Sequence, residues 1–139
     1  MMMNTCEMAV KVCDMPAGDG LILAEGLKGS VVIRLRDMLA RLRFRVRVAG
    51  SVADAVHMSR RRSPALVLGA GASLERFMRL AAAGAHDDAA RATARVAILE
   101  QGAPEDVLRL MMAGADECLV WPFSRQMLAR RLARLAQFA

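Results

Sequence analysis

The chain has 139 residues, of which 55% are apolar and 24% are charged, a balance that fits one globular domain and excludes a disordered chain. No stretch approaches the roughly 20 continuous apolar residues of a membrane span, which excludes a transmembrane helix. The net charge is +6 and nearly all basic residues are arginine, which suits acidic partners but is equally typical of a GC-rich genome.

Residues 1–19 are predicted to be a flexible N-terminal extension, and residues 20–139 are predicted to form the folded domain. Acidic residues at Glu7 and Asp14 interrupt the apolar part of the extension, which argues against a signal peptide. The cysteines of the chain are Cys6, Cys13 and Cys118. Because they are odd in number and lack metal-ligand partners at suitable spacing, we expect no metal, no cofactor and a reducing cytoplasm as the location.

From Gly20 onward, short apolar runs alternate with longer stretches of helical period, which indicates βαβ units and a parallel sheet. Leu21–Ala24 is the first predicted strand. An amphipathic helix follows, and its apolar stripe consists of Val32, Leu35, Met38, Leu39 and Leu42. Phe44–Val48 then alternates apolar residues with Arg45 and Arg47, the pattern of an edge strand that is solvated on one side.

The second helix is predicted to begin after Ser51, whose hydroxyl is a good N-cap, and to run towards Arg60–Arg62. Basic residues suit that end of a helix because of its dipole. Ser63–Pro64 breaks the helix, and Ala65–Leu68 is the third strand, expected at the centre of the sheet.

Small residues follow the third strand. We expect Gly69–Ala72 to be a loop and Ser73 to cap a third helix that continues to about Ala83. Gly84–Ala94 is a polar connection of undefined structure, and Val96–Leu99 is the fourth strand.

The fourth helix is predicted to begin at Pro104, which is favoured in a first turn, and to end at Ala113–Gly114. The fifth strand, Cys118–Val120, is halted by Trp121 and Pro122. Ser124 is the predicted cap of the last helix, whose apolar stripe is Met127, Leu128, Leu132 and Leu135. The chain therefore reads as an α/β domain in which five strands and five helices alternate.

The segment Ala113–Phe123 reads Ala-Gly-Ala-Asp-Glu, then Cys-Leu-Val, then Trp-Pro-Phe. It resembles the Ala-Gly-Ala-Asp-Asp, strand, Lys-Pro-Phe segment of the receiver domain of bacterial two-component response regulators. Ser63–Leu68 resembles the run into the central strand of that family, and the similarity covers about Leu21 to Ala136. The resemblance implies a flavodoxin-like (βα)5 three-layer sandwich with strand order 2-1-3-4-5, whose functional edge lies at the carboxyl ends of the strands.

Receiver chemistry needs an aspartate nucleophile after the third strand, paired acids for a divalent cation, a hydroxyl after the fourth strand and a lysine after the fifth. The nucleophile position is Ala70, which has no group to phosphorylate. The remaining positions are Glu25 and Gly26 for the acids, Glu100 for the hydroxyl and Trp121 for the lysine. The resemblance therefore implies a degenerate receiver that binds a partner and is not an enzyme.

A misaligned but functional receiver is the weakest reading, because no aspartate lies between Pro64 and Leu80. The switch of the family, which couples the hydroxyl to an aromatic residue on the fifth strand, also has no parts here. Its positions are Glu100 and Cys118. We expect one resident conformation, or a switch driven by a ligand that distinguishes two states.

The surface of the fourth helix, fifth strand and last helix commonly binds partners or a second copy in receivers. Its candidate partner-binding residues here are Trp121, Phe123, Met111, Arg125, Arg130, Arg131 and Arg134. Each has a plainer interpretation: the indole of Trp121 fills space left by the lysine, Met111 and Met112 fill gaps in the core, and the arginines form a solvated face.

The leading hypothesis is a stand-alone, non-phosphorylatable module of bacterial signalling that binds a protein, such as a kinase, a regulator or another receiver, or that forms a homodimer. The alternative is a cyclic dinucleotide or other phosphate ligand bound by the arginine-rich surface. Arg60–Arg62 is interpreted as a helix terminus, because no aromatic residues interleave with it, and nucleic acid is not an expected partner.

Overall fold

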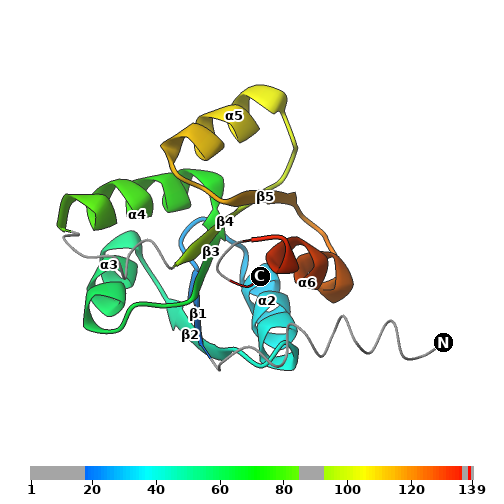
Figure 1. Cartoon of the computed structure of the whole chain (residues 1–139), viewed down its shortest axis with the longest axis horizontal. Helices are drawn as coiled ribbons and strands as arrows, with labels where there is room; N and C mark the ends of the chain where they lie inside the picture. The colour runs from blue at the N-terminus through cyan, green and yellow to red at the C-terminus, as the bar shows by residue number, and fades with distance from the viewer. Residues whose placement is uncertain (1–17, 85–92, 136–137, 139) are drawn as a thin grey trace.

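The computed structural model describes residues 18–84, 93–135 and 138. Five parallel strands form one sheet in the order β2-β1-β3-β4-β5, and helices alternate with them along the chain (Figure 1). The elements are β1 (Asp19–Leu23), α2 (Gly29–Arg41), β2 (Arg45–Ala49), α3 (Val52–Arg61), β3 (Leu66–Ala70), α4 (Gly71–Gly84), β4 (Ala94–Leu99), α5 (Pro104–Ala113), β5 (Glu117–Val120) and α6 (Arg125–Ala133). The flavodoxin-like fold predicted from the sequence is confirmed.

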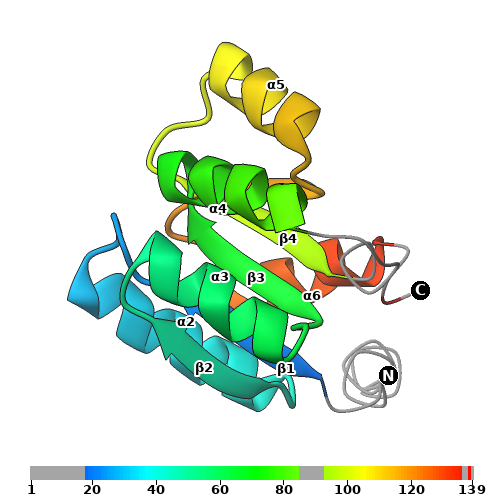
Figure 2. The ribbon, with the colours of Figure 1, turned by 90° about the vertical axis from the view of Figure 1, so that its left-hand side faces the viewer.

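Helices cover both faces of the sheet. Helices α2 and α6 pack on one face, while α3, α4 and α5 pack on the other (Figure 2). Strand β3 and residues Leu21–Leu23 of β1 are buried on both faces and are continuously apolar, whereas the edge strand β2 alternates arginine with valine. In β1, for example, Ile22 contributes to the core on the α2 side, whereas Leu21 and Leu23 contribute to the core on the α3 side.

The local signals at the helix ends are largely confirmed. The hydroxyls of Ser51 and Ser124 each accept a hydrogen bond from the backbone N–H three residues later, at 3.1 and 3.0 Å. Gly114 ends α5 with φ at +120°, a value that glycine adopts readily. The Trp121–Pro122 peptide bond is cis.

The loop predicted at Gly69–Ala72 is wrong. Strand β3 continues to Ala70, and α4 begins directly at Gly71. A Cβ atom at Gly71 would lie 3.0 Å from Leu99 Cδ2 and 3.1 Å from Leu110 Cδ1, so a larger residue here would require both leucine side chains to shift. Ser73 therefore lies inside the helix and is not its cap; the residue is buried and its hydroxyl donates to the backbone oxygen of Glu25 at 2.8 Å.

Three methionines differ from their expected burial. Met127 was placed in the apolar stripe of the last helix, but its side chain is exposed, as are Met111 and Met112 on α5. Helix α5 stands at the margin of the domain, and of its residues only Leu110 is buried (Figure 1). The methionines therefore enlarge the surface of α5 and α6 instead of filling the core.

Two predicted segments lie largely outside the described residues. Of the extension over residues 1–19, the structure describes Gly18 and Asp19, and Asp19 is the first residue of β1. Of the polar connection Gly84–Ala94, residues 85–92 lie outside, and β4 already begins at Ala94. No helix in the described part of the chain is long and apolar enough to cross a membrane.

Candidate functional site

The receiver positions predicted from the sequence meet at the carboxyl edge of the sheet. The register pairs Leu23 with Gly69, Ala70 with Ile98, and Leu99 with Val120, so the ends of β1, β3, β4 and β5 are level. The residues brought to this edge are Glu25, Gly26, Ala70, Glu100 and Trp121. The sequence therefore located the edge correctly.

The loop after β1 packs down onto Ala70. Gly26 has φ at +86°, in the left-handed region, and a Cβ atom placed on it would lie 3.4 Å from Ala70 Cβ and 3.0 Å from Ser73 Oγ. A methyl group at position 26 would thus already be in contact with the side chain of Ala70. Gly26 therefore lies beside the side chain of Ala70, and neither side chain offers an oxygen atom.

Glu25, the one acid retained from the receiver pattern, is engaged in structural contacts. Its Oε1 accepts a hydrogen bond from the backbone N–H of Val52, the first residue of α3, at 3.0 Å. Its Oε2 forms an ion pair with Arg76 on α4. A carboxylate at a helix N-terminus is favoured by the orphan N–H groups and by the helix dipole. Glu25 therefore links the β1–α2 loop to α3 and α4.

The residues at this edge do not fit the divalent cation that the receiver fold implies. Among the residues that the structure describes, no group of three His, Cys, Asp or Glu side chains could hold a metal ion. Gly26 supplies no side chain, and the oxygens of Glu25 already bind Val52 and Arg76. A hard cation needs several oxygen ligands at once, and the side-chain carboxylates at this edge come only from Glu25, whose oxygens are engaged, and from the exposed Glu100.

Trp121 lies where the receiver pattern has lysine. Its indole meets the ring of Phe123 edge to face, with centroids 5.1 Å apart, and the guanidinium of Arg34 lies 5.2 Å from the indole centroid. The indole is half-buried against the core, which agrees with the plainer interpretation that it fills space. Phe123 is only 7% exposed, so its proposed place on a partner-binding surface is corrected: it is a core residue.

The switch positions carry different chemistry. Glu100 is exposed, and Cys118 is half-buried in β5. Burial, and then the neighbouring charge of Glu117, raise the pKa of the Cys118 thiol above its usual value. Glu117 in turn accepts from Arg131 Nη1 at 3.0 Å. Cys118 has no aromatic ring to swing, so the usual coupling has no structural basis here.

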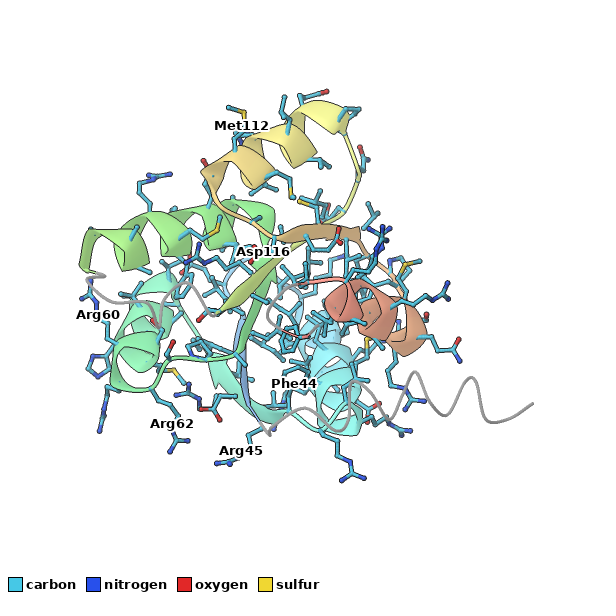
Figure 3. The ribbon with its side chains drawn as sticks, in the orientation of Figure 1. Phe44, Arg45, Arg60, Arg62, Met112 and Asp116 are labelled. Carbon is cyan, nitrogen blue, oxygen red and sulfur yellow. The ribbon has the colours of Figure 1, made fainter. Side chains whose placement is uncertain are left out.

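The surface of α5, β5 and α6 carries exposed apolar side chains. They are Leu108, Met111, Met112, Val120 and Met127. Figure 3 shows Met112 on the outer side of α5. Arg125, Arg130 and Arg134 are exposed nearby, whereas Arg131 is tied to Glu117. We refer to the five apolar residues as the apolar face.

Several residues of these sites were not found from the sequence. Ser73 and Arg76 hold Glu25, and Arg34 covers Trp121. Each pair joins segments that are distant in the chain, so no local spacing reveals it. Leu108 could have been found, since it is spaced three and four residues from Met111 and Met112 on one helical face.

Comparison with solved structures places the chain among receiver folds. CheY4, a chemotaxis response regulator of Vibrio cholerae, has a TM-score of 0.71 and 16% identity over 86% of this chain and 98% of its own. The receiver domain of a sensor histidine kinase from Pseudomonas aeruginosa, solved with magnesium in its active-site cleft, has a TM-score of 0.65 and 23% identity, covering 85% and 97%.

A chain of the CheX–CheY complex from Borrelia burgdorferi, which contains beryllofluoride and magnesium, has a TM-score of 0.65 and 16% identity, covering 83% of this chain and 86% of its own. Neither a protein-family model nor a curated protein sequence matches the chain. At these identities the likeness establishes the fold, and the site must be judged from its own residues.

Proposed function

We propose that this protein is a receiver-fold signalling module that accepts no phosphoryl group and acts by binding a protein partner. The observation that carries the proposal is that Ala70, at the nucleophile position, offers only a methyl group, and that Gly26 beside it offers no side chain. Phosphoryl transfer depends on a nucleophile and on cations that neutralise the transferred group. Here both are replaced, and the neighbouring acid stabilises the loop instead.

The first experiment tests phosphorylation directly. The protein is incubated with acetyl phosphate and magnesium, and separately with beryllofluoride and magnesium, while intact mass and the fluorescence of Trp121 are recorded. Trp121 is the single tryptophan of the chain and lies at the edge in question, so it reports binding there. We expect no mass increase and no saturable fluorescence change. A stoichiometric phosphoryl adduct would overturn the proposal.

Substitution of Ala70 sharpens this test. If the carboxylate alone were missing, Ala70→Asp would restore a response to beryllofluoride. Because Gly26 beside Ala70 supplies no acid and Trp121 replaces the lysine, we expect Ala70→Asp to remain unresponsive. CheY4-like receivers, which have this fold, serve as the positive control for the reagents.

The apolar face supports a protein as the partner. Apolar side chains on adjacent elements form the kind of patch that interfaces bury, and methionines adapt to several partners. A receiver-fold neighbour is solved as the CheX–CheY complex, so the fold is compatible with a bound protein. We assign the partner-binding role to Leu108, Met111, Met112, Val120 and Met127, with the arginines of α6 at the border of this apolar face.

This assignment is tested with matched variants. Leu108→Glu/Met112→Glu places two charges on the apolar face, and Ile33→Glu/Leu80→Glu places two charges at exposed apolar positions elsewhere. Light scattering measures the mass of the purified protein, and affinity capture measures a partner from the source cell. We expect only the first variant to lose the dimer or the captured protein. Equal behaviour of the two variants would contradict the assignment.

A phosphate ligand bound by the α6 arginines has less support. Arg131 is held by Glu117, and Arg125 and Arg134 stand at opposite ends of the helix, so the four guanidinium groups do not converge. Calorimetry with a cyclic dinucleotide distinguishes this alternative, since the protein-binding proposal predicts no saturable heat.

A further inference from the structure

The positive charge of the protein is concentrated in one part of the chain. The segment from Arg34 to Arg62 contains nine arginines and two aspartates, a net charge of +7, so the remainder of the chain carries a net charge of −1. Arginine enrichment from codon usage alone would raise the charge of every exposed segment. The unequal distribution therefore needs a structural or functional reason.

The fold brings five of these arginines to the amino edge of the sheet, opposite the edge that holds Ala70. Helices α2 and α3 run back against the strands, so both end where β2 and β3 begin. The exposed arginines at this edge are Arg43, Arg45, Arg60, Arg61 and Arg62, which we call the cationic rim. Figure 3 shows Arg45 and Arg62 at the lower rim of the domain, with Arg60 on the outer side of α3.

The acid closest to the rim is already neutralised. Asp19 is buried, and its Oδ2 lies 3.7 Å from Arg47 Nη2 and 3.5 Å from Arg62 Nη1. Arg47 also donates to the backbone oxygen of Arg62 at 3.2 Å, which holds the end of α3 against β2. The rim therefore presents an excess of positive charge on a rigid frame of strand and helix ends.

Two structural explanations account for part of the rim. Basic residues in the last turn of a helix interact favourably with its dipole, and this explains Arg60 and Arg61. Charged residues on an edge strand discourage aggregation, and this explains Arg45. Neither explains Arg43, which lies between α2 and β2 with φ at +72°, a backbone conformation that favours glycine. A long cationic side chain is kept there at a cost in stability.

The composition of the rim favours a phosphate backbone over a protein as its ligand. Protein interfaces are depleted of charge at their centre and depend on buried apolar or aromatic anchors. The apolar face, with its exposed leucine and methionines, lies on α5, β5 and α6, away from the rim. Nucleic-acid backbones require only an array of cations, and arginine binds phosphate in a bidentate way.

Single-stranded nucleic acids are less suitable as ligands of the cationic rim, because proteins bind them by stacking the bases on exposed aromatic rings. Phe44 is the aromatic residue within the rim segment, and its ring packs edge to face on Phe138 and against the core. We infer that the cationic rim of Arg43, Arg45, Arg60, Arg61 and Arg62 binds the phosphate backbone of a nucleic-acid duplex without reading its sequence.

The inference is tested by fluorescence anisotropy with the full chain and a labelled duplex DNA of about 30 base pairs of random sequence. The rim variant is Arg43→Gln/Arg45→Gln/Arg61→Gln, which spares the residues that contact Asp19 and Leu80. The control variant, Lys28→Gln/Arg36→Gln/Arg109→Gln, removes the same charge from exposed positions outside the cationic rim. Thermal unfolding verifies that both variants fold.

We expect wild-type binding to weaken about 100-fold or more between about 50 and 200 mM salt, as contacts with several phosphates predict. The rim variant should bind at least about tenfold more weakly at low salt and show a shallower salt slope, by about one unit for each lost contact. The control should stay within about threefold of wild type.

Three results would overturn the inference. They are no binding at low salt, equal losses in the rim and control variants, and tighter binding of polyglutamate than of duplex DNA. The last result would identify an acidic protein as the ligand of the rim. A single-stranded DNA of the same length and an RNA duplex are the further arms; a preference for the single strand would contradict the backbone-only mode, and equal binding of both duplexes would support it.

Discussion

At the carboxyl edge of the sheet, Glu25 forms an ion pair with Arg76 and accepts a hydrogen bond from the first N–H of α3, and the loop after β1 lies beside Ala70. At the amino edge, five arginines extend into solvent. The two edges belong to the same strands and differ in what their loops do. In receivers the carboxyl edge carries the chemistry. In this chain Glu25 makes structural contacts at that edge, and the exposed arginines lie at the other end of the strands.

If this comparison is right, substitutions at the carboxyl edge should lower stability more than substitutions at the amino edge. The largest effect is expected for Gly26→Ala. Its φ of +86° strains any side chain, and the new Cβ would press on Ser73 Oγ and Ala70 Cβ. We expect the free energy of unfolding to fall by about 2 kcal/mol in urea titrations followed by circular dichroism.

Gly29 provides the control for this prediction. It is the first residue of α2, and no atom lies within 4 Å of a Cβ atom placed on it. Gly29→Ala should leave stability unchanged or raise it by up to about 1 kcal/mol. If both substitutions changed the free energy of unfolding equally, the loop beside Ala70 would tolerate a side chain at position 26, which would contradict a tightly packed carboxyl edge.

A smaller effect is expected for Glu25→Ala, which removes the acceptor for Val52 N–H and the partner of Arg76. Loss of a hydrogen bond at a helix N-terminus typically costs about 1 kcal/mol. Asp37→Ala breaks a more exposed ion pair with Arg41 on α2 and should cost less than about 0.5 kcal/mol. Chemical unfolding of the two variants under the same conditions measures the difference. Equal losses in the free energy of unfolding would mean that the contacts of Glu25 do not stabilise the fold.

The smallest predicted change in stability is an increase, and it concerns a residue at the amino edge. Arg43→Gly relieves the left-handed conformation at φ +72° and should raise the free energy of unfolding by about 0.5 kcal/mol. Arg45→Gly, in strand β2, should lower it by a similar amount because glycine weakens strands. Both should weaken duplex binding in the anisotropy assay. A stability loss in Arg43→Gly would show that this arginine is retained for packing.

Features governed by neighbouring residues were predictable from the sequence. The caps at Ser51 and Ser124, the buried strands and the strand order suggested by Ala113–Phe123 all agree with the structure. The caps depend on hydrogen bonds within one helical turn, and the buried strands on a burial pattern that one strand displays by itself. The strand order came from the resemblance to receiver domains, and the carboxyl edge was located from the predicted strand ends.

Features that depend on tertiary packing were not predictable. Ser73 looked like a cap, but close contact of Gly71 with Leu99 and Leu110 starts α4 earlier. The partners of Glu25 and the cation over Trp121 come from other segments of the chain. The residues of the cationic rim come from two separate segments of the chain. Taken by itself, Arg60–Arg62 was interpreted as a helix terminus, and only the parallel sheet places Arg43 and Arg45 at the same edge.

The raised pKa of Cys118 has a consequence for oxidation. Peroxides and alkylating reagents attack the thiolate, and burial beside Glu117 keeps this sulfur protonated at neutral pH. The thiol of Cys118 in β5 is therefore expected to react with such reagents more slowly than an exposed cysteine, and a rise in pH should speed the reaction.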